Sequence, residues 1–366
     1  MPEISEVTGY SLELPLKEPF ETAKGSKTAS PAVIVELRLS NGIRGLGSAT
    51  PVKYVTGEDT ASVLSAIELC APDLKGLDAT AYLPIFEILA EALPHAHSAR
   101  AALEMAILDA FCKLHDLPMC KFFGGALLRV STDITIPLVD PDAARELARE
   151  AAIRGFEHLK IKVGSQDPED DLARVLAVSE AAPQCAIRLD ANQGFTPAVA
   201  VGFAGKIQEA GVKVDLFEQP VDRTDLDGLR YVTRNTSVPV FADESAVTPA
   251  DVLKLIELEA VDGINVKLMK CGISGALDII AMCKAARKEL MLGCMIETSI
   301  GLASAVHLAC GTGAFSRLDL DAHLLVAPDA EPSSGGFTHD GPSLIADDKS
   351  PGHGSVLTGT VGLVPS

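Results

Sequence analysis

From about residue 130 onward, short apolar segments alternate with amphipathic helical segments. Eight of these segments have the pattern of β-strands, and each is followed by a helical segment except the last: 132–138, 158–163, 186–190, 214–218, 239–243, 262–268, 291–297 and 316–320. A helix between two strands makes parallel pairing the expected arrangement, and eight βα units favour a closed TIM-like barrel of the (β/α)7β type. An open, doubly wound sheet is the alternative, but no G-x-G-x-x-G motif follows the first strand to support it.

The residues before this alternation follow a different pattern. The first 50 residues predict an antiparallel meander with a hairpin turn at Asn41-Gly42, and residues 58–116 have helical spacing that ends before Pro118. We therefore expect an N-terminal α+β capping domain over residues 1–125 and a barrel over residues 126–326. The remaining segment, 327–366, is rich in Gly, Pro and Ser, and we expect it to run back over the capping domain and complete it.

Charged residues lie at the C-terminal ends of seven consecutive predicted strands. In a βα barrel these ends form one ring, which is where active sites lie. A loop charge or a helix cap would explain one such residue, Glu297 or Asp321 above all, but it explains the whole series poorly. In chain order the series is Lys160 with Lys162, Asp190, Glu218, Asp243, Lys267, Glu297, and Asp319 with Asp321.

Three carboxylates on adjacent strands, Asp190, Glu218 and Asp243, can face one point. Hard oxygen ligands without His or Cys select Mg²⁺, with Mn²⁺ as the second choice. Lysines flank the three carboxylates in the ring, Lys160 and Lys162 before them and Lys267 after them. A metal with ammonium groups to either side suits removal of a proton next to a carboxylate, because both cations stabilise the enediolate.

Lys160 and Lys162 point to the same side of their strand, since side chains at i and i+2 share a face. We expect the charge of Lys160 to help keep Lys162 deprotonated, so that Lys162 can accept a proton. Two lysines on opposite faces of one carbon can move its proton from face to face. That reaction is a racemisation or an epimerisation.

Composition excludes several other classes of function. A net charge of −19 makes nucleic acid a poor partner. No apolar run reaches the roughly 18 residues of a membrane span, and the N-terminus does not have the pattern of a signal peptide. Eight scattered cysteines without a C-x-x-C pair predict reduced, buried thiols in a cytoplasmic protein.

With these motifs the sequence resembles the enolase superfamily, in its muconate-lactonizing-enzyme-like subgroup. The resemblance covers essentially the whole chain, with the N-terminal region similar to the family's capping domain. Its motifs span the barrel in order: LKIKVG (159–164), RLDANQG (188–194), FEQP (217–220), ADES (242–245), INVKLMK (264–270) and MIET (295–298).

Within the subgroup, RLDLD (317–321) resembles the D-x-D motif of dipeptide epimerases, L-Ala-D/L-Glu epimerases among them. The resemblance implies that Asp319 and Asp321 hold the free α-ammonium of an L,L-dipeptide, and two such carboxylates do form a cation site. It further implies a Mg²⁺-dependent 1,1-proton transfer at the α-carbon of the C-terminal residue, with a small dipeptide as the partner. By position it assigns Lys162 and Lys267 as the acid/base pair, Asp190, Glu218 and Asp243 as Mg²⁺ ligands, and Lys160 as a contact to substrate carboxylate or enolate oxygens. Asn192 and Glu244 would support the metal ligands, and Thr135 and Glu297 would contact the substrate.

Two stretches depart from the family pattern. The chain has KCGI (270–273) after the sixth strand, where many dipeptide epimerases have K-A-G-G or K-T-G-G. Epimerases that act on Ala-Glu carry an arginine in the capping loop PFETAKGSKTASP (19–31), and the corresponding place here is close to Gly25. Lys24 and Gly25 are candidate substrate contacts, although Lys24 and Lys27 also fit exposed loop lysines. An acidic and a hydrophobic C-terminal residue of the substrate therefore both stay open.

Three other functions stay open as alternatives. An N-acylamino acid racemase, an o-succinylbenzoate synthase or a muconate cycloisomerase would not need Asp319 and Asp321, which would repel an anionic acyl group. A Schiff-base barrel aldolase would leave the Asp-Glu-Asp set unexplained. A non-catalytic binding protein would be expected to have lost a base or a ligand. For any of these functions we expect a homo-oligomer.

Overall fold

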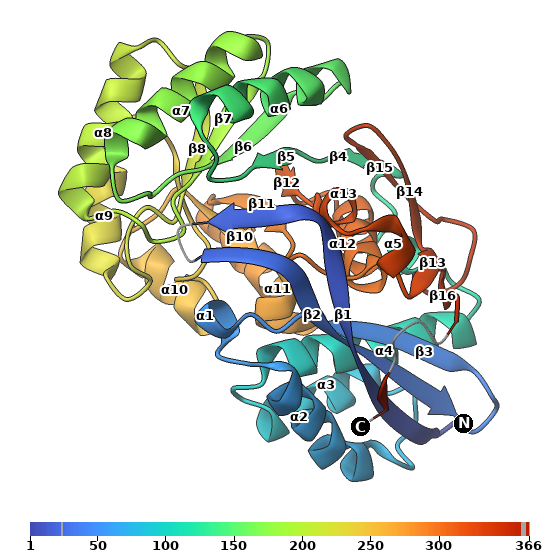
Figure 1. Ribbon diagram of the computed structural model, residues 1–366. Coiled ribbons are helices and arrows are strands. Elements are labelled where there is room, and N and C mark those ends of the chain that lie inside the picture. Colours follow the sequence, from blue (N-terminus) through green and yellow to red (C-terminus); the bar gives the residue numbers. More distant parts are fainter. Residues whose placement is uncertain (23–24, 360–363, 366) are drawn as a thin grey trace.

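The computed structural model of the chain describes residues 1–22, 25–359 and 364–365, and Figure 1 shows the barrel beside the N-terminal sheet. The eight strands of the barrel lie in chain order in one sheet, and all are paired in parallel. They are β5 (Ile134–Ile136), β6 (His158–Lys162), β7 (Ala186–Asp190), β8 (Val214–Glu218), β9 (Val240–Ala242), β10 (Gly263–Val266), β11 (Glu289–Gly293) and β12 (Arg317–Asp319).

A helix follows each of the first seven strands of the barrel. The helices are α6 (Pro141–Ile153), α7 (Pro168–Ala181), α8 (Pro197–Glu209), α9 (Leu226–Asn235), α10 (Pro249–Glu257), α11 (Leu268–Ala286) and α12 (Ser299–Thr312). After β12 there is only the single turn α13 (Ala322–Leu325). The predicted (β/α)7β barrel is confirmed.

Hydrogen bonds close the seam between the last strand and the first. The amide of Asp133 donates to Leu318 O at 3.2 Å, and the amide of Leu320 donates to Thr132 Oγ1 at 2.7 Å. Because these bonds join the two edges of the sheet, the doubly wound alternative is wrong.

The strand bounds differ most at β11, which was expected over 291–297 and ends at Gly293. The apolar residues Cys294, Met295 and Ile296 lie beyond the end of the strand and line a cavity above it. Glu297 therefore lies in the loop before α12 and not at the end of the strand.

The barrel interior beneath the strand ends is apolar and closely packed. Leu216, Phe241 and Met291 form a buried cluster. Each lies two residues before the position that ends its strand or directly follows it, and so points to the same side of the strand as the residue at that position. Gly263 gives the Phe241 ring its space, since a Cβ there would lie 2.4 Å from two ring carbons. This layer supports the charged ring from below.

The N-terminal part begins with an antiparallel sheet of β1 (Ile4–Thr22), β2 (Gly25–Leu39) and β3 (Arg44–Ala49). Five helices follow it: α1 (Lys53–Thr56), α2 (Thr60–Leu74), α3 (Tyr82–Ala92), α4 (His97–Leu114) and α5 (Met119–Phe122). The long helix α4 lies so close to β3 that a Cβ at Gly45 or Gly47 would be 1.9 Å from a helix carbonyl oxygen. The predicted meander followed by helices is confirmed.

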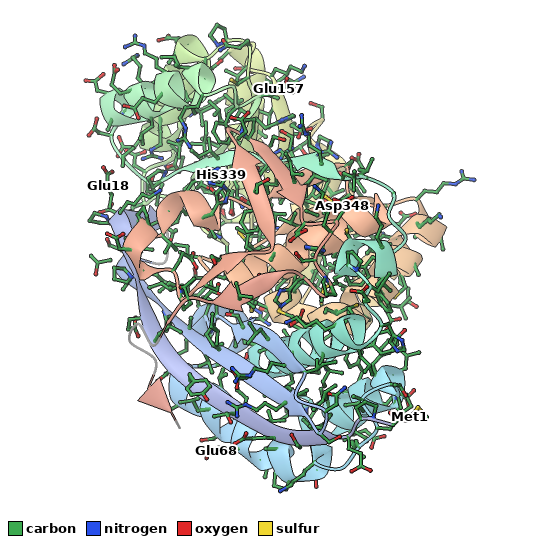
Figure 2. The ribbon with its side chains drawn as sticks, turned by 90° about the vertical axis from the view of Figure 1, so that its right-hand side faces the viewer. Met1, Glu18, Glu68, Glu157, His339 and Asp348 are labelled. Carbon is green, nitrogen blue, oxygen red and sulfur yellow. The ribbon has the colours of Figure 1, made fainter. Side chains whose placement is uncertain are left out.

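The C-terminal segment returns to the N-terminal part, and Figure 2 shows it running from the barrel towards the N-terminal sheet, where its last strand joins the edge of that sheet. It contains the 3₁₀ turn η1 (Pro328–Ala330) and the strands β13 (Ser333–Gly335), β14 (Phe337–Asp340), β15 (Ser343–Ala346), β16 (Ser355–Leu357) and β17 (Val364–Pro365). β17 pairs with β1, and β15 pairs with the short strand β4 (Arg129–Ser131). These contacts agree with the division at residues 125 and 326, which remains our proposal. In the described part of the chain, no helix has both the length and the hydropathy that a membrane span needs.

His307 of α12 joins three of these parts. Its Nδ1 accepts a hydrogen bond from the amide of Cys120 at 2.9 Å, so its Nε2 carries the proton and donates to Gly336 O at 2.9 Å. Burial lowers the pKa of His307 to about 4. The imidazole must therefore stay neutral for the contacts to form.

We predict that His307 makes the fold sensitive to acid. Its pKa is lower in the folded chain than in the unfolded chain, so its contribution is present above pH ~6.5 and is lost as pH falls towards 4. Between pH 7 and pH 5 this loss is roughly 2 kcal/mol, measurable by urea unfolding. His307→Gln should be less stable at pH 7, but its free energy of unfolding should decrease less between pH 7 and pH 5. In His115→Gln, at an exposed position, the free energy of unfolding should decrease as much as in the unaltered protein. An equal decrease in His307→Gln would contradict the assignment.

Candidate active site

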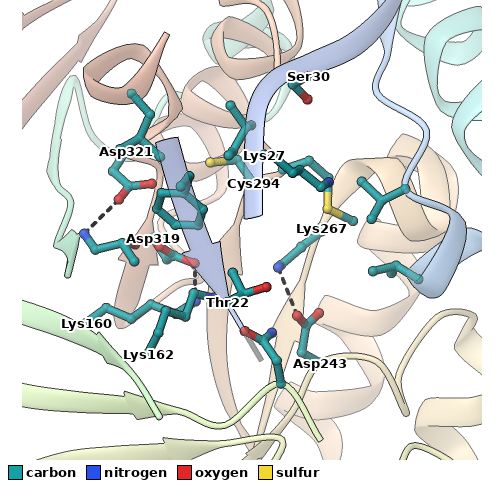
Figure 3. A pocket seen from close by; sticks show the side chains of 18 of the residues that line it. Thr22, Lys27, Ser30, Lys160, Lys162, Asp243, Lys267, Cys294, Asp319 and Asp321 are labelled. Atoms are coloured by element: carbon teal, nitrogen blue, oxygen red, sulfur yellow. Dashed lines mark hydrogen bonds and ion pairs between the residues drawn. The ribbon is translucent and has the colours of Figure 1, made fainter. Parts of the chain in front are cut away.

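Charged side chains from six of the eight strands meet at the C-terminal end of the barrel. None is more than 8% exposed, so each charge needs a partner. Figure 3 shows several of them around one cavity. The buried set is Lys160, Lys162, Asp190, Glu218, Asp243, Lys267, Asp319 and Asp321.

Lys160 is the centre of this set. Its Nζ lies 2.7 Å from Asp319 Oδ2, 2.9 Å from Glu218 Oε2 and 3.0 Å from Asp190 Oδ2. Burial alone would lower the pKa of Lys160, but the surrounding carboxylates raise it well above its usual value. Its charge is balanced by carboxylates, so the structure does not support the expected effect of Lys160 on the protonation of Lys162.

Lys162 lies two residues further along β6 and shares a partner with Lys160. Its Nζ is 2.6 Å from Asp190 Oδ2, the oxygen that Lys160 also contacts. Burial raises the pKa of Asp190, but the two ammonium groups outweigh burial and hold the pKa below its usual range. Asp190 is therefore an anion that fixes both lysines of the K-x-K pair.

Lys267 directly follows β10, and its Nζ lies 2.9 Å from Asp243 Oδ2. The other oxygen of Asp243 is 2.6 Å from the Nζ of Lys270, which also donates to the carbonyl oxygens of Asp243 and Asn265 at 2.7 and 2.8 Å. Although burial opposes it, Asp243 raises the pKa of Lys267. The sequence alone does not single out Lys270, which is completely buried. The available signal is its position one helical turn after Lys267.

The order of the strands fixes how these groups face one another. β6 and β10 are four strands apart in a closed ring of eight, so Lys162 and Lys267 come from opposite sides of the barrel. β8 and β12 are also four strands apart, which places Glu218 opposite Asp319. The carboxylates of β7, β8 and β9 lie on one side of the line between the two lysines, and Asp319 lies on the other.

The three carboxylates on β7, β8 and β9 have the donor chemistry of a Mg²⁺ site. Glu218 Oε1 accepts a hydrogen bond from Asn265 Nδ2 at 2.6 Å, whereas its buried Oε2 is held by the ion pair with Lys160. Burial and the charge of Asp190 raise the pKa of Glu218 to about 7. An additional cation would relieve this excess of negative charge.

A metal ion would have to replace ammonium contacts. Among the described residues, no three His, Cys, Asp or Glu side chains are grouped closely enough to hold an ion. Lysine nitrogens occupy the positions that face the carboxylates of Asp190, Glu218 and Asp243. The donor set therefore fits the metal in chemistry, and the assignment of these ligands remains a proposal.

Asp319 and Asp321 both line the cavity, as Figure 3 shows. Asp321 Oδ2 accepts a hydrogen bond from the amide of Thr135 at 2.8 Å, so the ends of β12 and β5 are joined at this point. Burial and the charge of Asp319 raise the pKa of Asp321. Two carboxylates, of which only Asp319 has a lysine partner, leave this wall suited to a further cation.

The capping domain covers the cavity. Phe20, Thr22, Gly25 and Lys27 line it from the end of β1 and the start of β2, and Val52, Tyr54 and Val55 line it from around α1. The Nζ of Lys27 lies 5.6 Å from the centre of the Tyr54 ring, and burial raises the pKa of Tyr54 to about 12. Lys27 is half-buried, so its interpretation as an exposed loop lysine is wrong. Lys24 falls outside the described residues.

The remaining candidates divide into two groups. Asn192 and Glu244 line the cavity, where Asn192 Nδ2 donates to Glu244 Oε1 at 3.3 Å, and Thr135 lines it as well. Glu297 is not among the lining residues. It folds back on its own loop, where its Oε1 accepts a hydrogen bond from the amide of Met295 at 3.1 Å. We therefore leave Glu297 out of the proposed substrate site.

Family models cover both parts of the chain. The model of the mandelate racemase/muconate lactonizing enzyme N-terminal domain matches residues 4–124, and that of the enolase C-terminal domain-like family matches residues 143–360. An aromatic dipeptide epimerase of Herpetosiphon aurantiacus is 36% identical over 351 residues, which cover 96% of this chain and 98% of the relative.

Two solved structures are also similar. One is a substrate-liganded complex of the L-Ala-D/L-Glu epimerase of Bacillus subtilis, with a TM-score of 0.94, 36% identity, and coverage of 97% of this chain and 99% of that one. The other is a dipeptide epimerase of Enterococcus faecalis in complex with Mg and the dipeptide L-Leu-L-Tyr. Its TM-score is 0.92, its identity is 37%, and the match covers 96% of this chain and 99% of that one.

We predict that Lys160→Met destabilises the chain by roughly 3–5 kcal/mol, because three buried carboxylates then lose their common cation. Millimolar Mg²⁺ should recover part of this loss and should raise the melting temperature of the variant more than that of the unaltered protein. Lys206→Met removes an exposed ion pair with Glu169 and should change little. A Lys160→Met variant of full stability, without a response to Mg²⁺, would show that the carboxylates do not depend on a cation.

Proposed function

The chain belongs to the mandelate racemase/muconate lactonizing enzyme family of the enolase superfamily, and from this premise we propose that it is a Mg²⁺-dependent dipeptide epimerase. The observation that carries the proposal is the placement of Lys162 and Lys267 on opposite strands of the barrel, with carboxylates between them. This arrangement suits a proton transfer from one face of a carbon to the other, and thereby the inversion of one stereocentre.

In the proposed reaction, a dipeptide lies with its C-terminal α-carbon between the two lysine nitrogens. One lysine removes the α-proton, and the other returns a proton to the opposite face. Lys160 contacts the substrate carboxylate, whose second negative charge develops as the proton leaves. The charged side chains of the ring are buried beneath the capping domain, so they act on one another more strongly than they would in water.

Asp190, Glu218 and Asp243 would hold the metal. Bound Mg²⁺ supplies positive charge that stabilises the enediolate. When Asp243 serves as a ligand it no longer favours the ammonium form of Lys267, which is a condition for Lys267 to accept a proton. Lys270 keeps a hydrogen bond to the carbonyl oxygen of Asp243 and so holds the end of β9 in place.

Asp319 and Asp321 would bind the free α-ammonium of the N-terminal residue. They supply two carboxylates on the side of the ring away from the three metal ligands. An acyl group in place of the ammonium would face buried negative charge, which disfavours the N-acylamino acid racemase and cycloisomerase alternatives.

The side chains of the dipeptide would lie against the capping domain, since the rest of the cavity is charged. Phe20 and Tyr54 favour an apolar or aromatic side chain there, and Lys27 favours an acidic one. The relatives include an aromatic dipeptide epimerase and an L-Ala-D/L-Glu epimerase, so both kinds of substrate belong in the test. Gly25 lies beside this surface, and Thr135 lies beside the ammonium site.

We further propose a cytoplasmic location, Mn²⁺ as a possible replacement for Mg²⁺, and a homo-oligomeric assembly. The eight cysteines are all buried and unpaired, which supports a reducing compartment. Oxygen donors alone accept Mn²⁺ as well as Mg²⁺.

The proposal is tested with libraries of L,L-dipeptides in D₂O with Mg²⁺, followed by mass spectrometry. We expect one deuterium at the α-carbon of the C-terminal residue, and the labelled masses identify the preferred side chains. If no dipeptide takes up deuterium while Mg²⁺ still binds, the epimerase proposal fails. N-acyl amino acids and cycloisomerase substrates would then be tested.

We predict that Lys162→Ala and Lys267→Ala each lower epimerisation by at least about 10³-fold, because each variant lacks one of the two proton carriers. Their unfolding curves should still be cooperative. Each variant should lose proton abstraction mainly from one of the two epimers, which deuterium exchange from the separate L,L and L,D dipeptides would measure. Near-normal turnover in both variants would contradict the mechanism. Lys206→Ala, at an exposed position, is the matched control.

We predict that Asp321→Asn weakens binding of dipeptides with a free N-terminus, by about tenfold to a hundredfold in kcat/KM. The reason is the loss of one of the two charges that face the ammonium group. N-acetylated dipeptides, which are poor substrates in any case, should not be affected further. An equal loss on free and acetylated dipeptides would show that Asp321 acts on the fold through Thr135 and not on the substrate.

A further inference from the structure

Helix α11, which follows Lys267, is broken after its first turn. Gly272 has φ 70° and ψ −175°, a conformation that no α-helix contains and that favours glycine. The helix therefore consists of a separate turn, 268–271, and a regular part that begins at Ile273. Nothing in the proposed reaction explains this break.

The separate turn is bound to the site. The amide of Lys270 donates to Lys267 O at 2.9 Å, and the Nζ of Lys270 donates to Asp243 and Asn265 O. Lys267 itself is the residue that precedes the turn. The position of the turn therefore determines where the ammonium groups of Lys267 and Lys270 lie.

A carboxylate from the other domain fills the break. Glu104 lies on α4 of the capping domain and is completely buried. Its Oε2 accepts a hydrogen bond from the amide of Ser274, and its Oε1 accepts one from the hydroxyl of Ser274, both at 2.8 Å. Glu104 thus caps the regular part of α11. A Cβ at residue 272 would lie 2.5 Å from Glu104 Oε2, so glycine and glutamate fit together here.

Arg100, one turn before Glu104 on α4, completes the contact. Its Nη2 donates to the carbonyl oxygen of Cys271 at 3.3 Å, and its Nε lies 3.7 Å from Glu104 Oε1. One helix of the capping domain therefore holds both sides of the break, the carbonyl before Gly272 and the amide after it. Neither Arg100 nor Glu104 lines the cavity.

We propose that Glu104 is a positioning residue, which holds the turn 268–271 and thereby aims Lys267 at the substrate. The inference rests on the proposed function only in naming Lys267 as one of two proton carriers. The capping domain would then have a second role besides covering the cavity. Through Glu104 it would fix the position of Lys267. In the described part of the chain, no hydrogen bond or ion pair joins Lys162, on β6, to the capping domain, so Lys162 would not depend on Glu104.

The test compares Glu104→Ala with Glu104→Gln. Glutamine can keep both bonds, since its Oε1 accepts from the Ser274 amide and its Nε2 donates to the Ser274 hydroxyl. We expect Glu104→Gln to stay within about threefold of normal kcat, and Glu104→Ala to lose about 10- to 100-fold in kcat with little change in KM. In D₂O, Glu104→Ala should also exchange the α-hydrogen of one epimer without inverting it, because Lys162 still works while Lys267 is displaced.

The matched control is Asp109→Asn. Asp109 lies on the same helix and is equally buried, but it contacts the amides of Leu46 and His353 and not α11. We expect a stability loss as large as that of Glu104→Ala, with normal kcat and no exchange without inversion. Normal kcat in Glu104→Ala, or equal kinetic losses in both variants, would overturn the proposal. If Glu104→Ala does not fold, Ser274→Ala can be used, because it removes one of the two hydrogen bonds to Glu104. This variant should also show more α-hydrogen exchange relative to inversion than the unaltered protein.

Hydrogen–deuterium exchange of the backbone separates this inference from the proposed function. Glu104→Ala should increase exchange in the peptide that covers 268–275, beyond any global change seen in Asp109→Asn. This result does not require a substrate. If the dipeptide screen is negative but this local change appears, the epimerase proposal fails and the clamp on the turn stands. If the screen is positive and residues 268–275 stay protected, the clamp fails alone.

Discussion

The structure depends on a balance of buried charges at one end of the barrel. Lys160 contacts three carboxylates, one each from β7, β8 and β12, so its ammonium group joins opposite sides of the ring. A buried carboxylate or ammonium without a partner is strongly unfavourable, whereas a paired one holds its neighbours in fixed positions. The same pairs that keep the ring together place each group at the site. Stability and function use one set of contacts here.

The fold supplies the conditions for this balance. The apolar layer of Leu216, Phe241 and Met291 closes the barrel from below, and the capping domain covers the ring from above. Water is thereby kept from the ions, so each charge acts more strongly on its neighbours than it would at a surface. The capping domain is also attached to the barrel through α4, which reaches the first turn of α11.

The barrel and most of the site could be predicted from the sequence, because both follow from local patterns. Alternating apolar strands and helices specify the βα units, and the residue at the end of each strand then belongs to one ring. What could not be predicted depends on contacts between distant segments. Lys270 is buried beside Asp243, Lys27 is half-buried because the start of β2 covers the cavity, and Glu297 turns back on its own loop. The local sequence pattern does not determine the orientation of these three side chains.

The seam between β12 and β5 has a consequence for how this protein can change. The bond from the Thr135 amide to Asp321 closes the barrel with the same carboxylate that we assign to the substrate ammonium. A replacement of Asp321 that suits a substrate without that ammonium group would therefore also remove a hydrogen bond that closes the barrel. The cavity wall formed by Phe20, Lys27 and Tyr54 is not part of any strand pair of the barrel. Evolutionary drift among side-chain preferences is accordingly easier than a change in the length or charge of the substrate, and a laboratory library for new specificity would best begin at that wall.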